Sequence, residues 1–478
     1  MIRAAARLPL PRTDLPLIGA GFALTSFLAL AATQVGEGLS LALIVVLTLF
    51  FAIVTAFVVA PHIAIACTIP IFALIPMLKV LVFPWIGPFK DMITLAAISA
   101  AAILVVQRSS QGRSQRGDFW VAAAAGVFAA LYVVNVGGLT WDLAWTHGVR
   151  LAFEPLALLL VGLALGDARR TLRWAMVSLV ATAVVVAAVG IAQQLVGEWA
   201  LYDLGYSFRV HLRTFQGHLR SFGTLDEPFA YAAFLLLALA SLLMWFRLNV
   251  LTIAAGSVIL TGLAFSFVRT ALVVVLALGA LWLARKGYTA TSVFLMAVAA
   301  LSALVILFVS STATETRTVR TGTSTFLTVN GRTEAWRLFL NDPKVWFLGH
   351  GVGKVGTAAE RATYKLTQDP QEASRQIAID SGYFAVIADI GLLGLAAMLA
   401  IFGRLLARAR HFAARGSPAG WVALGLTAVL MIDAVTRASF TGFPTAFLAL
   451  LVAGLAIGAA IEGDPATAAE ARSRRSRR

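Results

Sequence analysis

The sequence predicts an all-α, polytopic membrane protein with about 14 spans and a large extracytoplasmic helical loop between late spans. The chain has 478 residues, of which 60% are apolar and 13% charged, whereas soluble proteins are roughly 45–50% apolar and about 25% charged. A spanning helix needs about 20 apolar residues, so this composition supplies roughly fourteen of them. Lysines and arginines also gather on alternate connections, as they do in polytopic proteins.

Composition further limits the class of protein. The net charge of +15 would suit a nucleic-acid partner, but in a polytopic chain a basic excess is first expected in the cytoplasmic loops, so no nucleic acid is expected. The single cysteine, Cys67, excludes an intrachain disulfide and a cysteine-rich metal site. The basic start, Met1 to Arg12, leads into an apolar run without a cleavage pattern, so we interpret it as preceding the first span.

Apolar runs of spanning length define the predicted elements. We place the spans at residues 15–33, 39–60, 62–83, 91–107, 119–138, 148–166, 174–195, 229–246, 250–268, 270–284, 289–310, 382–403, 420–435 and 444–461. The ninth and tenth spans are divided by a short break, because only Val268 to Thr270 separates the two apolar runs. A single long helix there would put Arg404 to Arg415 outside, against the charge rule.

The distribution of basic residues gives the orientation. The basic connections carry Arg3, Arg7 and Arg12; Arg108, Arg113 and Arg116; Arg169, Arg170 and Arg173; Arg247; Arg285 and Lys286; Arg404, Arg408, Arg410 and Arg415; and Arg472, Arg474, Arg475, Arg477 and Arg478. Both termini are therefore predicted to be cytoplasmic, which requires an even number of spans.

Two connections are too long to be turns, and this topology puts both on the outer face. The chain then divides into an N-terminal bundle (1–195), a first outer loop with the central spans (196–310), a large outer loop (311–380), and C-terminal spans with a basic cytoplasmic tail (381–478). The large loop is polar yet rich in aromatic residues, so we expect it to fold, with a short amphipathic helix over residues 331–340.

Charged residues on the outer loops and within spans are the first functional candidates. The first outer loop carries Arg209, His211, Arg213, His218 and Arg220. These residues favour an anion site, with contact to lipid headgroups or a solvated loop as the alternatives. Arg269 has apolar residues for fifteen or more positions on both sides. A charge at such depth is expensive and predicts a function, unless the side chain snorkels to the interface.

The remaining intramembrane charges indicate structure rather than chemistry. Arg150 with Glu154, and Asp433 with Arg437, are opposite charges four residues apart and are expected to neutralise each other. Asp389 and Lys79 have no partner that the sequence identifies.

Five short motifs follow one another with the expected sidedness. They are Arg220-Ser221-Phe222-Gly223-Thr224, Ser266 to Arg269, Arg332 to Trp336, Gly349-His350-Gly351, and Asp380-Ser381 ahead of Gly391 to Gly394. Over about residues 196–405 this order resembles the bacterial O-antigen ligase and O-antigen polymerase family. Ligases of that family have a histidine where this chain has Asp380, which favours the polymerase branch.

The resemblance implies a membrane glycosyltransferase of the bacterial cytoplasmic (inner) membrane. It would transfer or polymerise glycan repeat units from an undecaprenyl-diphosphate-linked donor to a glycan acceptor at the outer face, with inversion and without nucleotide sugar, cofactor or metal. Its partners would be the donor, the acceptor, the lipid bilayer and other polysaccharide-assembly membrane proteins.

Roles for individual residues follow from this chemistry. Arginine forks stabilise a departing diphosphate bidentately, and an acceptor hydroxyl needs a base, so Arg220, Arg269 and Asp380 are the catalytic candidates. His350 and Glu334 are the next candidates for the base, although His350 could merely pack in a glycine-rich turn and Asp380 could merely cap a helix. The substrate-binding candidates are Arg213, Arg332, Glu334, Arg337, His350 and Tyr383.

Two other classes compete with this interpretation. A transporter or flippase would show repeated halves and charges near the membrane midplane, and the sequence shows no repeat. A non-catalytic assembly partner would leave Arg269 unexplained.

Overall fold

The computed structural model describes residues 37–110, 119–208, 211–215, 217–288, 343–367 and 381–463. Within them the chain is mostly helical, and seven helices are long and apolar enough to cross a membrane. These are α3 (Pro61–Leu81), α4 (Phe89–Ser110), α6 (Leu143–Ala164), α7 (Ala168–Val196), α9 (Pro228–Trp245), α17 (Gly382–Ala414) and α19 (Thr445–Glu462). The chain is therefore an all-α, membrane-embedded protein.

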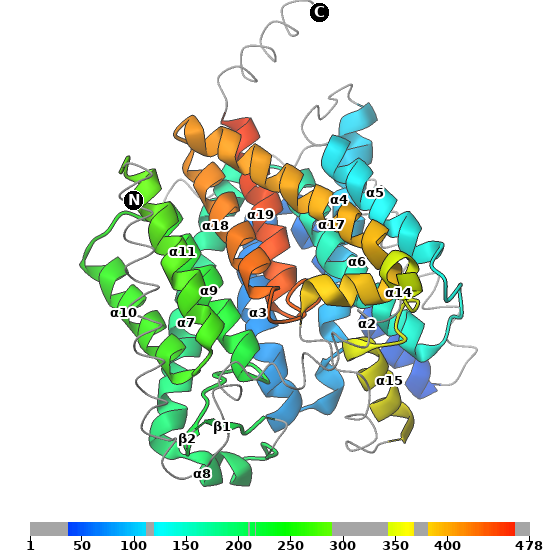
Figure 1. Ribbon diagram of the computed structural model, residues 1–478, viewed down its shortest axis with the longest axis horizontal. Helices are drawn as coiled ribbons and strands as arrows, with labels where there is room; N and C mark the ends of the chain where they lie inside the picture. Colours follow the sequence, from blue (N-terminus) through cyan, green and yellow to red (C-terminus); the bar gives the residue numbers. More distant parts are fainter. Residues whose placement is uncertain are drawn as a thin grey trace, which may run out of the picture.

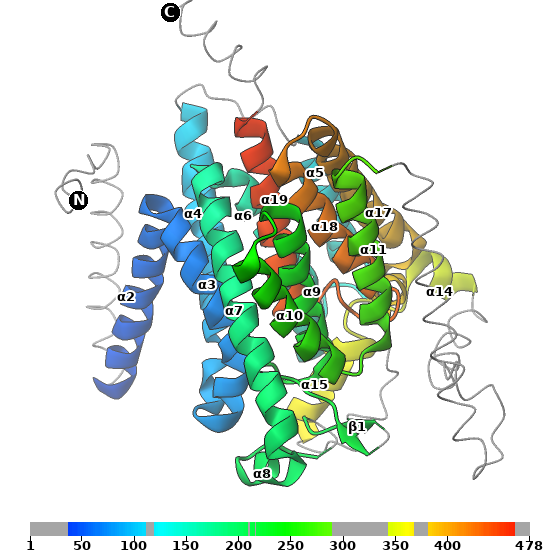
Figure 2. The ribbon, with the colours of Figure 1, turned by 90° about the vertical axis from the view of Figure 1, so that its left-hand side faces the viewer.

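Five further helices belong to the same bundle (Figures 1 and 2). They are α2 (Glu37–Val59), α5 (Phe119–Val133), α10 (Val250–Phe265), α11 (Arg269–Arg285) and α18 (Pro418–Asp433). A helix thus lies at each predicted span within the described residues. The spans at 15–33 and 289–310, and the helix at 331–340, lie outside those residues, so the total of about fourteen spans stays a prediction.

The predicted break between the ninth and tenth spans is a turn between α10 and α11. The backbone leaves the helix at Ser266, and the Ser266 Oγ accepts a hydrogen bond from the amide of Val268 at 3.2 Å. Phe267 adopts a left-handed conformation with φ of 50°. The prediction of two helices is confirmed.

The central helix of the bundle is α19, which packs against α6, α7, α9 and α18 (Figure 1). Its closest neighbour is α6, and two glycines make that approach possible. A Cβ atom built on Gly162 would collide with the carbonyl of Leu451, and one built on Gly454 would collide with the carbonyl of Leu159. Small residues at such crossings let helix backbones pack closely in membranes.

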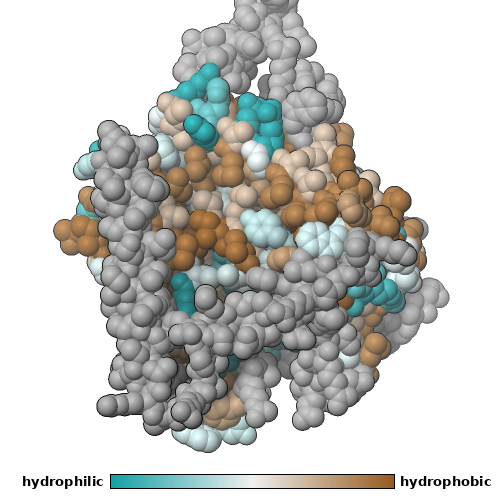
Figure 3. Space-filling view, in the orientation of Figure 1, coloured by the Kyte–Doolittle hydropathy of each residue, from teal (hydrophilic) through white to brown (hydrophobic). Residues whose placement is uncertain are grey.

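The irregular segments gather at one end of the bundle, which we call the loop end. These are α8 (Glu198–Asp203), the hairpin of β1 (Thr214–Phe215) and β2 (His218–Leu219), and α15 (Gly356–Thr367), seen at the bottom of Figure 1. In Figure 3, apolar side chains cover the middle of the visible face and hydrophilic residues lie above them, at the opposite end. The visible face of the bundle therefore has an apolar zone below a polar end.

Helix α17 contains a break, and α14 (Pro343–Leu348) packs against it. Ile390 and Gly391 have non-helical dihedral angles, and Figure 1 shows the two parts of α17 running in different directions. Gly391 has φ of 71°, and a Cβ there would collide with the Phe347 carbonyl. The short first part of α17 thus ends where α14 meets it.

The contact between α6 and α19 generates a prediction about stability. Gly162→Ala and Gly454→Ala should each lower the free energy of unfolding by about 1–3 kcal/mol, because the added methyl group overpacks a backbone contact. Gly279→Ala is the matched control, since nothing lies within 4 Å of a Cβ at that helical position, and it should gain up to about 1 kcal/mol from helix propensity. Thermal unfolding in detergent, followed by circular dichroism, measures all three. Equal melting temperatures for the three variants would contradict this packing.

Candidate functional site

The segment that joins the hairpin to α9 is fixed to the bundle by its backbone. The Gln193 side chain accepts hydrogen bonds from the amides of Phe222 and Gly223 at 3.0 and 2.9 Å and donates to the Gly223 carbonyl at 2.8 Å. The Thr224 hydroxyl donates to the Ala73 carbonyl of α3 at 2.8 Å. Gly223 has φ of 58°, and a Cβ there would meet the Tyr231 ring. The predicted motif that starts at Arg220 is therefore rigid, and the part played by Gln193 was not predicted from the sequence.

Arg220 is the first residue of this segment, and only part of its guanidinium group is bonded to the described part of the chain. Its Nε donates to the Ser266 carbonyl at 3.1 Å, and its Cζ lies 4.6 Å from the centroid of the Phe229 ring. Within the described residues, its two Nη groups make no hydrogen bond or ion pair. Burial and the nearby charges of Arg213 and Arg269 lower the pKa of Arg220 to about 10, which Glu227 partly opposes. The charges that act on Arg220 are thus those of two arginines and of one carboxylate, and that carboxylate also lies 3.3 Å from Arg437. Such an excess of positive charge around Arg220 favours binding of an anion.

The other two arginines come from the hairpin and from α11. The carbonyl of Arg213 accepts a hydrogen bond from the amide of Arg220 at 2.8 Å. Arg269 is the first residue of α11, and its Cζ lies 5.2 Å from the centroid of the Phe215 ring. Arg269 is exposed at the turn between α10 and α11, and its depth in the membrane stays a prediction.

Arg437 joins the end of α18 to the start of α9. Its guanidinium lies 3.2 Å from the Asp433 carboxylate and 3.3 Å from the Glu227 carboxylate, and it donates to the Phe229 carbonyl at 2.6 Å. The predicted pairing of Asp433 with Arg437 is confirmed. The sequence did not indicate Glu227 as a second partner.

The start of α17 is attached to the same region. The Gly382 amide donates to the carbonyls of Ala434 and Arg437 at 2.8 and 2.6 Å, and the buried Ser381 hydroxyl donates to Ala434 at 3.2 Å. Asp380, the predicted base, lies outside the described residues, as do Arg332, Glu334 and Arg337. Tyr383 is described, and its hydroxyl donates to the Met431 carbonyl at 2.9 Å, a packing contact between α17 and α18.

His350 lies near the other end of the short first part of α17. Its amide donates to the Ala388 carbonyl at 2.6 Å, six residues or about 9 Å of helix beyond Gly382. Its flanking residues, Gly349 and Gly351, have φ of 76° and 101° and lie against neighbouring backbone. The glycines therefore serve close packing, while the His350 side chain is exposed.

The same glycine-rich segment supplies one of the two partners of Asp389, and α5 supplies the other. This carboxylate accepts hydrogen bonds from the Tyr132 hydroxyl at 3.1 Å and from the Gly353 amide at 3.2 Å. Both partners are remote in sequence, which explains why they were not identified.

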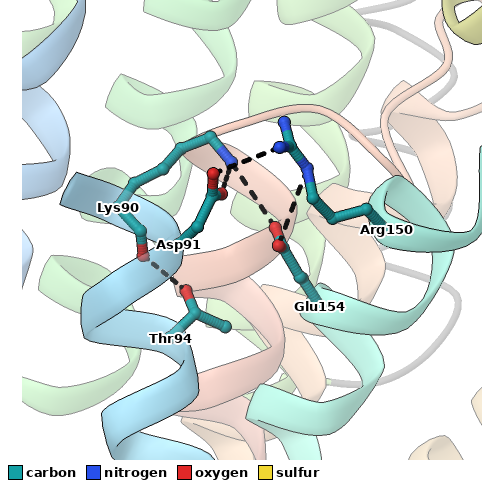
Figure 4. Close-up of polar contacts among 5 residues, drawn as sticks. All are labelled: Lys90, Asp91, Thr94, Arg150 and Glu154. Carbon is teal, nitrogen blue, oxygen red and sulfur yellow. Dashed lines mark hydrogen bonds and ion pairs between the residues drawn. The ribbon is translucent and has the colours of Figure 1, made fainter. Parts of the chain in front are cut away.

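A second cluster of charged residues lies between the start of α4 and the middle of α6 (Figure 4). Lys90 pairs with Asp91 and lies 3.4 Å from Glu154, while Arg150 lies 3.2 Å from Asp91 and 3.7 Å from Glu154. The predicted pairing of Arg150 with Glu154 is confirmed, and Lys90 and Asp91 were missed. Two positive and two negative groups balance each other here, so this cluster supports structure rather than ligand binding.

No protein-family model and no curated protein matches this chain. In the described part of the chain, no group of three or more histidine, cysteine, aspartate or glutamate side chains could hold a metal ion.

Arg437 generates a prediction about the integrity of the site. Arg437→Ala should lower the free energy of unfolding by about 3–5 kcal/mol, because it leaves the buried carboxylate of Asp433 without its counter-charge. Lys354→Ala is the control, since Lys354 and its partner Asp142 are each 43% exposed and such pairs contribute at most about 1 kcal/mol. Thermal unfolding in detergent separates the two. Similar losses in both variants would show that Arg437 has no special structural role.

In contrast to Arg437, Arg220 is expected to contribute little to the stability of the ligand-free protein. Arg220→Gln should leave the melting temperature of the ligand-free protein unchanged or higher, because it removes repulsion among three arginines. Inorganic pyrophosphate should raise the melting temperature of the wild type but not of this variant, whereas Arg247→Gln, an exposed arginine outside the site, should respond like the wild type. Binding needs the protonated guanidinium, so the effect should decline as the pH rises through about 10. An undiminished response of Arg220→Gln would place the anion elsewhere.

Proposed function

We propose that this chain is a membrane glycosyltransferase that transfers or polymerises glycan units from a polyprenyl-diphosphate-linked donor. The observation that carries the proposal is Arg220, whose two Nη groups make no hydrogen bond or ion pair with the described residues and whose pKa is lowered by burial and by the nearby charges of Arg213 and Arg269, at the loop end of an apolar helix bundle. We refer to these three arginines as the arginine cluster. A lipid diphosphate has its charge at the membrane surface and its chain in the apolar layer, which matches this placement. In our proposal the loop end is extracytoplasmic, the membrane is the bacterial cytoplasmic membrane, and both termini are cytoplasmic.

The reaction is a direct displacement. The oxygen of an acceptor hydroxyl attacks the anomeric carbon of the donor sugar while the bond from that carbon to the diphosphate oxygen breaks. The hydroxyl proton passes to a general base, for which Asp380 is the candidate. The lipid diphosphate leaves with the electron pair and gains negative charge, which the forks of Arg220 and Arg269 stabilise by bidentate hydrogen bonds. One displacement inverts the anomeric centre.

The position of Ser381 supports the choice of Asp380. Ser381 and Gly382 are bonded to the turn that contains Arg437, and Arg437 holds the carbonyl of Phe229, whose ring lies against Arg220. Ser381 and Gly382, which directly follow Asp380 in the sequence, are therefore connected to Arg220 through Arg437 and Phe229. His350 is attached farther along α17, at Ala388, which makes it the weaker candidate.

The location of the charges favours an enzyme over a transporter. The cluster lies at one end of the bundle, and the second group of charges, at Lys90 and Glu154, is internally balanced. A transporter instead places substrate charges near the membrane midplane.

Purified protein incubated with undecaprenyl-diphosphate-linked repeat units tests the proposal. Lengthened glycan would identify a polymerase, and transfer to a different added acceptor would identify a ligase. Activity should survive EDTA, because arginines rather than a metal ion neutralise the diphosphate. Arg220→Lys and Arg269→Lys keep the charge but lose the fork, so each should lose most of the turnover.

Asp380→Asn separates a general base from a helix cap in the same assay. Loss of a base typically costs about 10²–10⁴ in rate with donor binding retained, whereas asparagine caps a helix as well as aspartate does. A fully active Asp380→Asn variant would move the base to His350 or Glu334. Absence of any glycan transfer by the wild type would refute the proposed function.

A further inference from the structure

An open pocket of about 620 Å³ lies at the loop end beside α8. It is lined by Glu198, Phe208, Leu212, Arg213, Thr214 and Gly217. Its volume falls in the range of about 300–1,000 Å³ that is typical of sites for small organic ligands. The pocket therefore has room for more than the phosphate groups assigned to Arg220.

The lining combines one aromatic ring with polar groups of both hydrogen-bonding kinds. Phe208 is 37% exposed and presents an apolar surface, while Glu198 accepts, Arg213 donates, and the Thr214 hydroxyl does both. Within the described residues, the side chains of these three polar residues make no hydrogen bond or ion pair with the protein. A sugar ring has an apolar face and a rim of hydroxyl groups that donate and accept, so this set of side chains complements it.

The pocket is connected to the arginine cluster through the hairpin. Arg213 lines the pocket, and its carbonyl accepts the amide hydrogen bond of Arg220 at 2.8 Å. Thr214, the next lining residue, pairs with Leu219 in the antiparallel ladder. Arg220 follows Leu219 directly, so the pocket and the arginine cluster are adjacent. In a lipid-linked donor the sugar and the diphosphate are likewise directly joined.

Exposed aromatic residues place the pocket at the membrane surface. Trp199 is 69% and Tyr202 50% exposed, and their ring centroids lie 5.3 and 5.2 Å from that of Phe208. Trp85 and Trp141, on two other connections of the bundle, are 87% and 70% exposed. Tryptophan and tyrosine collect at the boundary between headgroups and acyl chains. A glycan attached to a membrane lipid can therefore reach the pocket without leaving the bilayer surface.

We propose that this pocket is a carbohydrate subsite, which holds the sugar rings of a lipid-linked glycan whose diphosphate lies at Arg220. The inference rests on the proposed function and adds to it the residues that bind the transferred sugar. Phe208 packs against the apolar face of the ring, and Glu198, Arg213 and Thr214 bind its hydroxyl groups.

Photo-crosslinking tests the subsite whichever sugar the protein binds. p-Benzoylphenylalanine is introduced at Thr214 or at Glu198, which both line the pocket, and the full-length protein is irradiated in the membranes of producing cells. Mass spectrometry of the crosslinked peptides should show carbohydrate at one or both positions. The control position is Leu366 of α15, which is 75% exposed at the same end of the bundle, and it should capture no carbohydrate. Phospholipid alone, or no adduct, at both pocket positions would overturn the proposal.

A side-chain truncation supplies the second measurement. Phe208→Ala should lower the yield of carbohydrate adduct by roughly 2- to 10-fold, as expected for loss of one aromatic contact, while the stabilisation by pyrophosphate through Arg220 stays unchanged. An unchanged yield would remove Phe208 from the subsite and contradict the proposed packing.

Failure of the subsite and failure of the proposed function give different results. Carbohydrate captured without an attached diphosphate would leave the subsite intact and refute the donor class. Absence of carbohydrate, with the pyrophosphate response of Arg220 retained, would refute the subsite and leave the donor class intact.

Discussion

The guanidinium of Arg437 is the contact on which the geometry of the candidate site depends. It joins Asp433 at the end of α18 to Glu227 and the Phe229 carbonyl at the start of α9. The backbone carbonyl of Arg437 also accepts the amide hydrogen bond of Gly382, which positions the start of α17. The side chain of Arg437 thus joins two helix ends and its backbone a third, and the side chain can do so because its planar fork offers five donors in fixed directions.

Charge balance separates the two polar clusters of the bundle. At Lys90, Asp91, Arg150 and Glu154, each charge has an opposite partner, and the Lys90 Nζ also lies 5.2 Å from the ring centroids of Phe443 and Phe447. At Arg220, burial and the nearby charges of Arg213 and Arg269 lower the pKa, and the carboxylate of Glu227 opposes them. Like charges close together do not stabilise a folded protein. Their proximity to Arg220 is understandable if this arginine binds an anion such as a diphosphate.

Close backbone contacts give this site a rigid support. Gly162 and Gly454 allow α6 and α19 to approach at the centre of the bundle, and Gly349, Gly353 and Gly391 allow the segment after α14 to pack on the break in α17 and on α6. Packing of this kind replaces the hydrophobic effect, which offers little force between helices surrounded by lipid. Catalytic groups carried by loops need such support, because turnover depends on their distances from the reacting atoms.

The sequence by itself determined the features that depend on local spacing. Runs of apolar residues defined the helices, the short polar break at residues 268–270 separated α10 from α11, and spacing by one helical turn identified the Arg150–Glu154 and Asp433–Arg437 pairs. These predictions are correct because helix length and the contact between residues four apart follow from backbone geometry alone.

Only the tertiary structure decided which helices meet and which side chains converge. The contacts of Arg437 with Glu227, of Lys90 with Glu154 and of Tyr132 with Asp389 join residues that are 210, 64 and 257 positions apart. The tertiary structure likewise placed Arg269 beside the Phe215 ring of the hairpin, a contact that the apolar flanks of Arg269 did not indicate. The physical reason is that helices in a membrane are apolar on nearly every side, so their sequences carry little of the amphipathic pattern that tells a soluble helix which face to bury.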